Sequence, residues 1–132
     1  MATQKKVLCI EDDTFLANLI MGKLVGAGIL TVSAHNGAEG LALVALEQPS
    51  LIMLDLMLPD MRGNDVLIHL KENPVTKDIP VIIFSNLGER EDIEKAIGQG
   101  ASAYLIKSST LPGEVIDVVE KQLGISDDKS TR

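Results

Sequence analysis

The sequence predicts an α/β fold with one five-stranded parallel sheet and helices on both of its faces. The first observation behind this prediction is that short apolar runs alternate with helical stretches five times along the chain. The second is that most of these runs are apolar throughout, as in strands that are buried on both faces. Regular alternation of this kind is typical of parallel sheets with right-handed crossovers. The length of 132 residues fits one domain with a sizeable core.

Five apolar runs predict the strands, at residues 7–10, 30–34, 51–54, 80–84 and 103–106. The run at 30–34 is the least apolar of the five, and its β-branched residues are what indicate a strand there. Because the other four runs are apolar throughout, we expect those four strands to be buried on both faces of the sheet.

A helix is predicted after each strand, because apolar residues recur there at helical spacing. In the first helix these residues are Phe15, Leu16, Leu19, Ile20 and Leu24. In the second they are Leu41, Ala42, Ala45 and Leu46, which we expect to share one face. The other three helices are predicted around residues 66–70, 93–97 and 115–123. Gly26 and Gly28 end the first helix, and Pro49 ends the second.

Five strand–helix units of this kind predict the flavodoxin-like strand order 2-1-3-4-5. In this arrangement the ligand crevice lies at the carboxyl ends of the strands. We expect residues 1–125 to form the single domain and residues 126–132 to form a polar C-terminal tail.

The composition excludes several classes of function. The formal net charge is −7, and the chain has one Tyr, two Phe and no Trp. It therefore lacks the basic surface and the stacking side chains that nucleic-acid binding needs. The same charge disfavours anionic membranes, and no apolar run is long enough for a transmembrane helix. A short apolar N-terminus and a single cysteine, Cys9, favour a cytoplasmic location, and Cys9 is expected to be a packing residue within its strand.

Polar residues follow four of the five predicted strands. Glu11, Asp12 and Asp13 follow the first strand, and the third, fourth and fifth end in Asp55, Ser85 and Lys107. The carboxyl ends of parallel strands meet at one edge of the sheet, so we expect these side chains to share one crevice. Crowded carboxylates favour a hard cation such as Mg²⁺, and a lysine beside them suits a phosphoryl group. The chemistry that follows is phosphoryl transfer to a carboxylate nucleophile.

Each of these residues also has an ordinary structural explanation. An acid that follows a strand can cap the next helix, and for Asp13 this explanation and a role in the site remain equally open. A single Asp at a strand end is usually a turn residue, a single Lys is usually a solvated charge, and a Ser often caps a turn. Only their joint placement at four strand ends favours a functional site.

Four motifs in order carry a resemblance to a known family. They are VLCIEDD at residues 7–13, DLMLPDMRG at 55–63, PVIIFS at 80–85 and GASAYLIK at 100–107. With these motifs the chain resembles, over essentially its whole length, a single-domain receiver of the chemotaxis type from the response regulators of two-component signalling. Each motif alone is weak, but all four at these separations are specific.

The resemblance implies a metal site and a phosphoacceptor. Asp55 matches the phosphoacceptor of the family. The residues that match its ligands for Mg²⁺ (or Mn²⁺) are Glu11, Asp12, Asp55 and the backbone carbonyl of Met57. Asp12 matches the more direct ligand of the acidic pair, and Glu11 matches one that acts through a water. Met57 and Leu87 resemble positions that tune the lifetime of the phosphoryl group, where apolar bulk hinders an attacking water.

Further roles follow from the same resemblance. Ser85 and Lys107 match the hydroxyl and the amine that bind phosphoryl oxygens. Tyr104 matches an aromatic residue whose inward or outward rotamer accompanies activation, although an ordinary half-buried aromatic remains an alternative for it. The family usually has proline directly after the lysine, in a cis peptide, whereas this chain has Ser108. A cis bond before a non-proline residue is unfavourable by about 2.5–4 kcal/mol, so a trans or a strained loop is expected here.

The function implied is that of a phosphorylatable receiver rather than an enzyme with an external substrate. Its phosphoryl donor would be a sensor histidine kinase or a phosphotransfer protein, and an unknown downstream protein would read the phosphorylated state. Two alternatives remain open. One is a receiver-like interaction module that is not phosphorylated. The other is an aspartate-nucleophile phosphohydrolase, which is disfavoured because those enzymes carry a second Asp where this chain has Met57.

Overall fold

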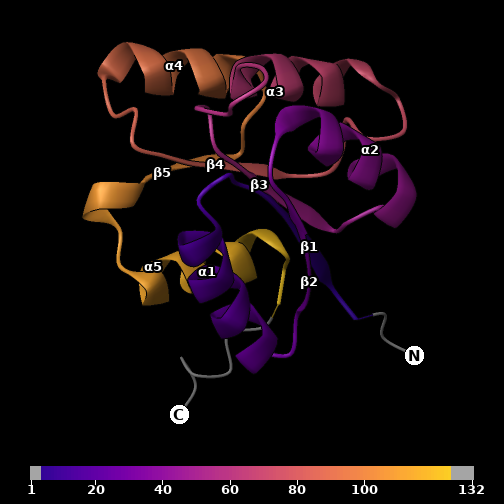
Figure 1. Ribbon diagram of the computed structural model, residues 1–132, viewed down its shortest axis with the longest axis vertical. Helices are drawn as coiled ribbons and strands as arrows, with labels where there is room; N and C mark the ends of the chain where they lie inside the picture. Colours follow the sequence, from indigo (N-terminus) through magenta and orange to yellow (C-terminus); the bar gives the residue numbers. More distant parts are fainter. Residues whose placement is uncertain (1–3, 126–132) are drawn as a thin grey trace.

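Strands and helices alternate along residues 4–125, which are the residues that the computed structural model describes (Figure 1). The strands are β1 (Lys6–Ile10), β2 (Leu30–Ala34), β3 (Leu51–Leu54), β4 (Val81–Ser85) and β5 (Ala103–Ile106). The helices are α1 (Thr14–Gly26), α2 (Gly37–Glu47), α3 (Gly63–Glu72), α4 (Arg90–Gly98) and α5 (Pro112–Gln122). A short 3-10 helix, η1 (Lys107–Ser109), follows β5. The predicted tail at 126–132 lies outside the described residues.

All four strand pairings are parallel, and the strand order is β2-β1-β3-β4-β5. This confirms the predicted fold class and order. The register aligns the last residues of β1 and β3, where Ile10 pairs with Leu54, and those of β4 and β5, where Ser85 pairs with Ile106. The residues that follow these pairs, among them Glu11, Asp55 and Lys107, therefore leave the sheet along the same edge.

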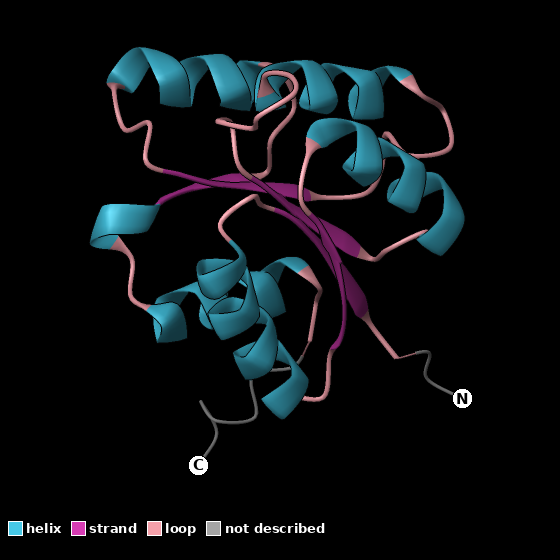
Figure 2. Cartoon of the chain, in the orientation of Figure 1, coloured by secondary structure: helices cyan, strands magenta, loops and turns pink. Residues whose placement is uncertain are grey.

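Helices cover both faces of the sheet, with α1 and α5 on one side and α2, α3 and α4 on the other (Figures 1 and 2). Alternate residues of β1 reach the two cores, since Val7 and Cys9 pack toward α1 and α5 whereas Leu8 and Ile10 pack toward α2 and α3. Burial raises the pKa of Cys9 to about 12, in keeping with its predicted packing role. None of the described helices has the length and apolarity needed to cross a bilayer.

Two predictions about burial were wrong. We expected β5 to be buried on both faces, but its residues are only half-buried because β5 forms one edge of the sheet. On α2, Leu46 is 76% exposed and Ala42 and Ala45 are also exposed, so of the expected apolar face only Leu41 packs against the core. The buried residues of this helix are Gly37, Gly40 and Val44.

The physical reason for the difference in α2 is a close approach between helix and sheet. A Cβ atom added to Gly40 would lie 2.6 Å from Cδ1 of Ile10, so only glycine allows this contact with β1. The helix is apolar on several sides, and the glycines select the side that packs. In α1 the buried residues are Ala17, Ile20 and Leu24, whereas Phe15 is 80% exposed.

Candidate functional site

Three carboxylates meet at the carboxyl edge of the sheet. Glu11 and Asp12 follow β1 and Asp55 follows β3, and one oxygen from each lies within 4.8 Å of the others. Glu11 and Asp55 are only 2% and 4% exposed, whereas Asp12 faces solvent. The structure therefore brings together three of the four acids that the sequence placed in one crevice.

Asp13 belongs to α1 rather than to this cluster. Its side chain accepts a hydrogen bond of 3.0 Å from the backbone N–H of Leu16, and its backbone is extended as at a helix N-cap. Glu11 in turn accepts a 3.0 Å bond from the N–H of Asp13. Of the two explanations left open for Asp13, the structural one is correct.

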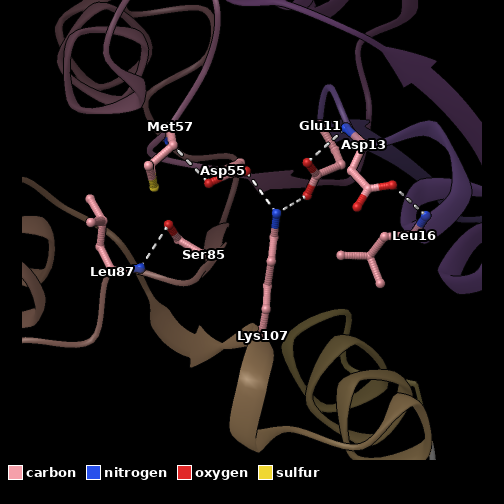
Figure 3. Close-up of polar contacts among 8 residues, drawn as sticks. All are labelled: Glu11, Asp13, Leu16, Asp55, Met57, Ser85, Leu87 and Lys107. Carbon is pink, nitrogen blue, oxygen red and sulfur yellow. Dashed lines mark hydrogen bonds and ion pairs between the residues drawn. The ribbon is translucent and has the colours of Figure 1, made fainter.

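Lys107 extends between two of the carboxylates, as Figure 3 shows. Its Nζ lies 2.8 Å from Oδ2 of Asp55 and 2.5 Å from Oε1 of Glu11, and its side chain is 12% exposed. Burial alone would lower the pKa of Lys107, but its bonds to Asp55 and Glu11 outweigh burial and raise it. Lys107 is thus a fixed positive charge within the acidic cluster.

The chain after Lys107 continues without a cis peptide. All described peptide bonds are trans, including the bond to Ser108, so the trans alternative is correct. Lys107 begins the 3-10 helix η1, and the hydroxyl of Thr110 donates a 2.7 Å hydrogen bond to the carbonyl of Ile106. The first turn of α5 starts at Pro112, as expected for a proline at this position.

Ser85 and Tyr104 both contact the main chain of Leu87, in the connection from β4 to α4. The N–H of Leu87 donates a 3.3 Å hydrogen bond to Oγ of Ser85, which is fully buried (Figure 3). The hydroxyl of Tyr104 donates to the carbonyl of Leu87. Burial is the main cause of a raised pKa for Tyr104. One connecting residue therefore joins the predicted hydroxyl of the site to the predicted switch aromatic.

Met57 is tied to Asp55 by its main chain. Its N–H donates a 3.0 Å hydrogen bond to Oδ1 of Asp55, while its side chain is 56% exposed. The loop that follows closes on itself, because the N–H of Gly63 donates to the carbonyl of Leu56 over 3.0 Å. A Cβ atom at Gly63 would lie 2.6 Å from Cα of Leu56, so glycine is required here. Gly63 was not among the predicted site residues, although a glycine directly before a helical pattern is a usable signal.

A cavity of about 720 Å³ opens beside the cluster. It lies between the β3–α3 connection and α4, with Asp12, Met57 and Leu87 at the end near the site. Side chains of both charges, including Arg62, Asp92 and Lys95, line the rest. A polar group of a second molecule can reach the acidic cluster from this side.

The donor set fits a hard divalent cation. Glu11, Asp12 and Asp55 offer carboxylate oxygens from two adjacent strands, and Mg²⁺ prefers oxygen ligands of this type. Burial raises the pKa of Glu11 to about 7 even though its bond to Lys107 lowers it. A carboxyl group with such a pKa gains from a nearby cation, so the cluster can hold a metal ion.

Comparison with known proteins agrees with this geometry. Residues 7–120 match the response regulator receiver domain family. The chain belongs to this family. This receiver domain is therefore a phosphorylatable receiver of two-component signalling. Its flavodoxin-like strand order and its acidic cluster are those predicted from the alternating strands and from the residues that follow them.

The relatives that match this receiver domain include a protein of similar length and a longer protein of which this chain covers less than half. The polar-differentiation response regulator DivK of Brucella anthropi is 30% identical over 91% of this chain and 97% of its own length. The DNA-binding dual master transcriptional regulator RpaA of Synechocystis is 39% identical over 77% of this chain, which spans 42% of that protein. The signal receiver domain of a LuxO-type repressor from Vibrio parahaemolyticus is 29% identical, with a TM-score of 0.86 over 92% of each chain.

Metal affinity and stability of this receiver domain are expected to respond to pH in opposite directions. The pKa of Glu11 is about 7 in the folded chain against 4.5 ordinarily, so the folded state binds a proton more tightly than the unfolded state. As the pH falls from 7 to 5, protonation of Glu11 stabilises the metal-free fold. It also removes a charge that a cation needs, and the affinity for Mg²⁺ falls about tenfold per pH unit.

Calorimetric titration with Mg²⁺ and thermal unfolding without it, both between pH 5 and pH 8, measure these two trends. In the variant Glu11→Gln, both the Mg²⁺ affinity and the thermal stability are expected to depend much less on pH. A wild-type Mg²⁺ affinity that stays constant across this range would contradict the prediction.

Proposed function

We propose that Asp55 is the phosphoacceptor of this receiver domain. The observation that carries the proposal is the placement of its carboxylate, which is buried at the sheet edge and bonded to Lys107 and to the N–H of Met57. Because both carboxylate oxygens of Asp55 are bonded, the group is held in one orientation, which favours its attack on an approaching phosphorus atom. The cavity of about 720 Å³ beside Met57 and Leu87 supports approach of the donor from that side.

We further propose that Glu11, Asp12, Asp55 and the backbone carbonyl of Met57 hold Mg²⁺ or Mn²⁺. When bound, the cation neutralises charge on the transferring phosphoryl group. The three carboxylate positions support this proposal, because one oxygen from each lies within 4.8 Å of the others. Mg²⁺ commonly binds through one or two carboxylates and takes its other ligands from carbonyls, waters or phosphate oxygens.

In the proposed transfer, a carboxylate oxygen of Asp55 attacks the phosphorus of a phosphohistidine on the donor protein. The new P–O bond forms as the P–N bond breaks, and the imidazole nitrogen keeps the electron pair. The ammonium of Lys107 and the hydroxyl of Ser85 bind phosphoryl oxygens as charge develops on them. Lys107 is already bonded to Asp55, so little movement is required of it.

Signal output is proposed to use the Leu87 contacts. Recruitment of the Ser85 hydroxyl to a phosphoryl oxygen would break its bond from the N–H of Leu87 and change the connection that also holds Tyr104. The connection is proposed to exist in two arrangements, with and without the bond from Leu87 to Ser85, and phosphorylation shifts the equilibrium between them. The donor is proposed to be a sensor histidine kinase or a phosphotransfer protein in the cytoplasm, and the chain is proposed to catalyse only its own phosphorylation and dephosphorylation.

The proposal is tested by incubating the protein with Mg²⁺ and a small phosphodonor and measuring its intact mass. We expect an added mass of one phosphoryl group that depends on Mg²⁺ and is lost on unfolding in mild base, as acyl phosphates are. Absence of any adduct, with a donor that modifies a control receiver, would favour the unphosphorylated interaction module instead. Sustained turnover of a phosphate ester would favour the phosphohydrolase.

A further inference from the structure

The loop between β3 and α3, residues 56–62, carries the proposed metal-binding carbonyl of Met57. Main-chain contacts within the loop hold only its two ends, through the bond from Gly63 to Leu56 and a bridge between Met57 and Arg62. Its middle, residues 58–61, depends on contacts with another part of the chain.

The main contact of this kind joins Asp60 to the N-terminus of α2. The carboxylate of Asp60 accepts hydrogen bonds from the N–H groups of Gly37 and Ala38, over 2.7 and 2.9 Å. These bonds lower the pKa of Asp60. The first amides of a helix have no partner within the helix and attract negative charge, so this pairing is favourable on both grounds.

The other cap of α2 comes from Asn36, which precedes the helix. Its Oδ1 accepts a 2.8 Å hydrogen bond from the N–H of Glu39. Asn36 and Asp60 therefore share the free amides of the same helix end, but only Asp60 belongs to the loop beside the acidic cluster. This difference allows the two roles, capping the helix and holding the loop, to be separated.

A second contact strengthens the link between the loop and the helix. Met61 packs against Gly37, where an added Cβ atom would lie 2.5 Å from Sδ of Met61 and 3.2 Å from Cγ2 of Val66. Gly37 is buried, and Met61 packs against the core on this face of the sheet. Asp60 and Met61, which are neighbours in the loop, thus contact the same turn of α2, Asp60 through hydrogen bonds from its amides and Met61 through packing.

We propose that Asp60 is a positioning residue of this receiver domain. By binding the N-terminus of α2, its carboxylate holds the β3–α3 loop in the shape that presents Met57 to a divalent cation beside Asp55. This inference rests on the metal site proposed above and adds α2 as the support of that site. Residues that orient metal ligands without touching the metal commonly change affinity by about 10- to 100-fold when removed.

The test compares Asp60→Ala with Asn36→Ala, because each removes one cap of α2 and only the first releases the loop. Calorimetric titration with Mg²⁺, well below the unfolding temperature, is expected to give a Kd about tenfold higher for Asp60→Ala. The Kd of Asn36→Ala is expected to match the wild type. Amide hydrogen exchange of the metal-free proteins is expected to quicken across residues 57–62 only in Asp60→Ala.

An unchanged Kd in Asp60→Ala would overturn the inference, as would an equal loss of affinity in both variants, because Asp60 would then act only by capping α2. Slow exchange of residues 57–62 in Asp60→Ala would also overturn it. These results are distinct from failure of the proposed function, in which the wild type itself binds no Mg²⁺ or gives no phosphoryl adduct.

Discussion

Replacement of Asp55 by Asn is expected to abolish the phosphoryl adduct completely. The amide has nearly the shape of the carboxylate and can still accept a bond from Lys107, but its oxygen is a poor nucleophile and carries no charge. Folding is therefore expected to survive while the covalent step is lost. Because Asp55 also belongs to the carboxylate cluster, the affinity for Mg²⁺ is expected to fall as well.

Intact mass after incubation with Mg²⁺ and a small phosphodonor measures this result. Asp117→Asn is the matched control, because Asp117 is an exposed acid on α5, on the opposite face of the sheet from the β3–α3 loop. The control is expected to form the adduct at the wild-type rate. An adduct that persists in Asp55→Asn at that rate would show that another residue is the nucleophile.

The sequence predicted the fold because its strands are nearly continuous apolar runs, and such runs leave few other arrangements for a chain of this size. It also predicted which side chains meet, since each of Glu11, Asp55 and Lys107 directly follows a strand. Parallel pairing alone brings these positions to one edge. The positions of these three residues could be predicted because each depends only on where its strand ends.

Prediction failed where packing between elements decided the outcome. Helical periodicity could not select the buried side of α2, because apolar residues occur on several sides and the close approach of Gly40 to Ile10 settles it. The hydrogen bond that the N–H of Gly37 donates to Asp60 joins residues 23 positions apart. From sequence, Asp60 is an ordinary acid in a turn after a proline, and no periodicity indicates its partner.

Removal of the Lys107 charge is expected to be the most damaging single change to the metal-free fold. In Lys107→Met the aliphatic stem is largely kept, but the buried carboxylates of Glu11 and Asp55 lose their cation. The contact of Nζ with the ring of Phe84, at 5.9 Å from the ring centroid, is lost as well. Buried charges left without a partner destabilise a fold by about 3 kcal/mol, or about 10 °C in Tm for a domain of this size. The rate of phosphorylation is expected to fall about 100-fold, because a donor to the phosphoryl oxygens is also lost.

Thermal unfolding with and without Mg²⁺ separates the causes of this loss. If the damage comes from unpaired carboxylates, Mg²⁺ supplies the missing positive charge and brings the Tm of Lys107→Met back toward that of the wild type. Lys121→Met, at an exposed position on α5, is expected to change neither the Tm nor the response to Mg²⁺. A Lys107→Met protein as stable as the wild type without Mg²⁺ would mean that Glu11 and Asp55 do not need Lys107 in the folded chain. The ammonium would then serve phosphoryl transfer alone.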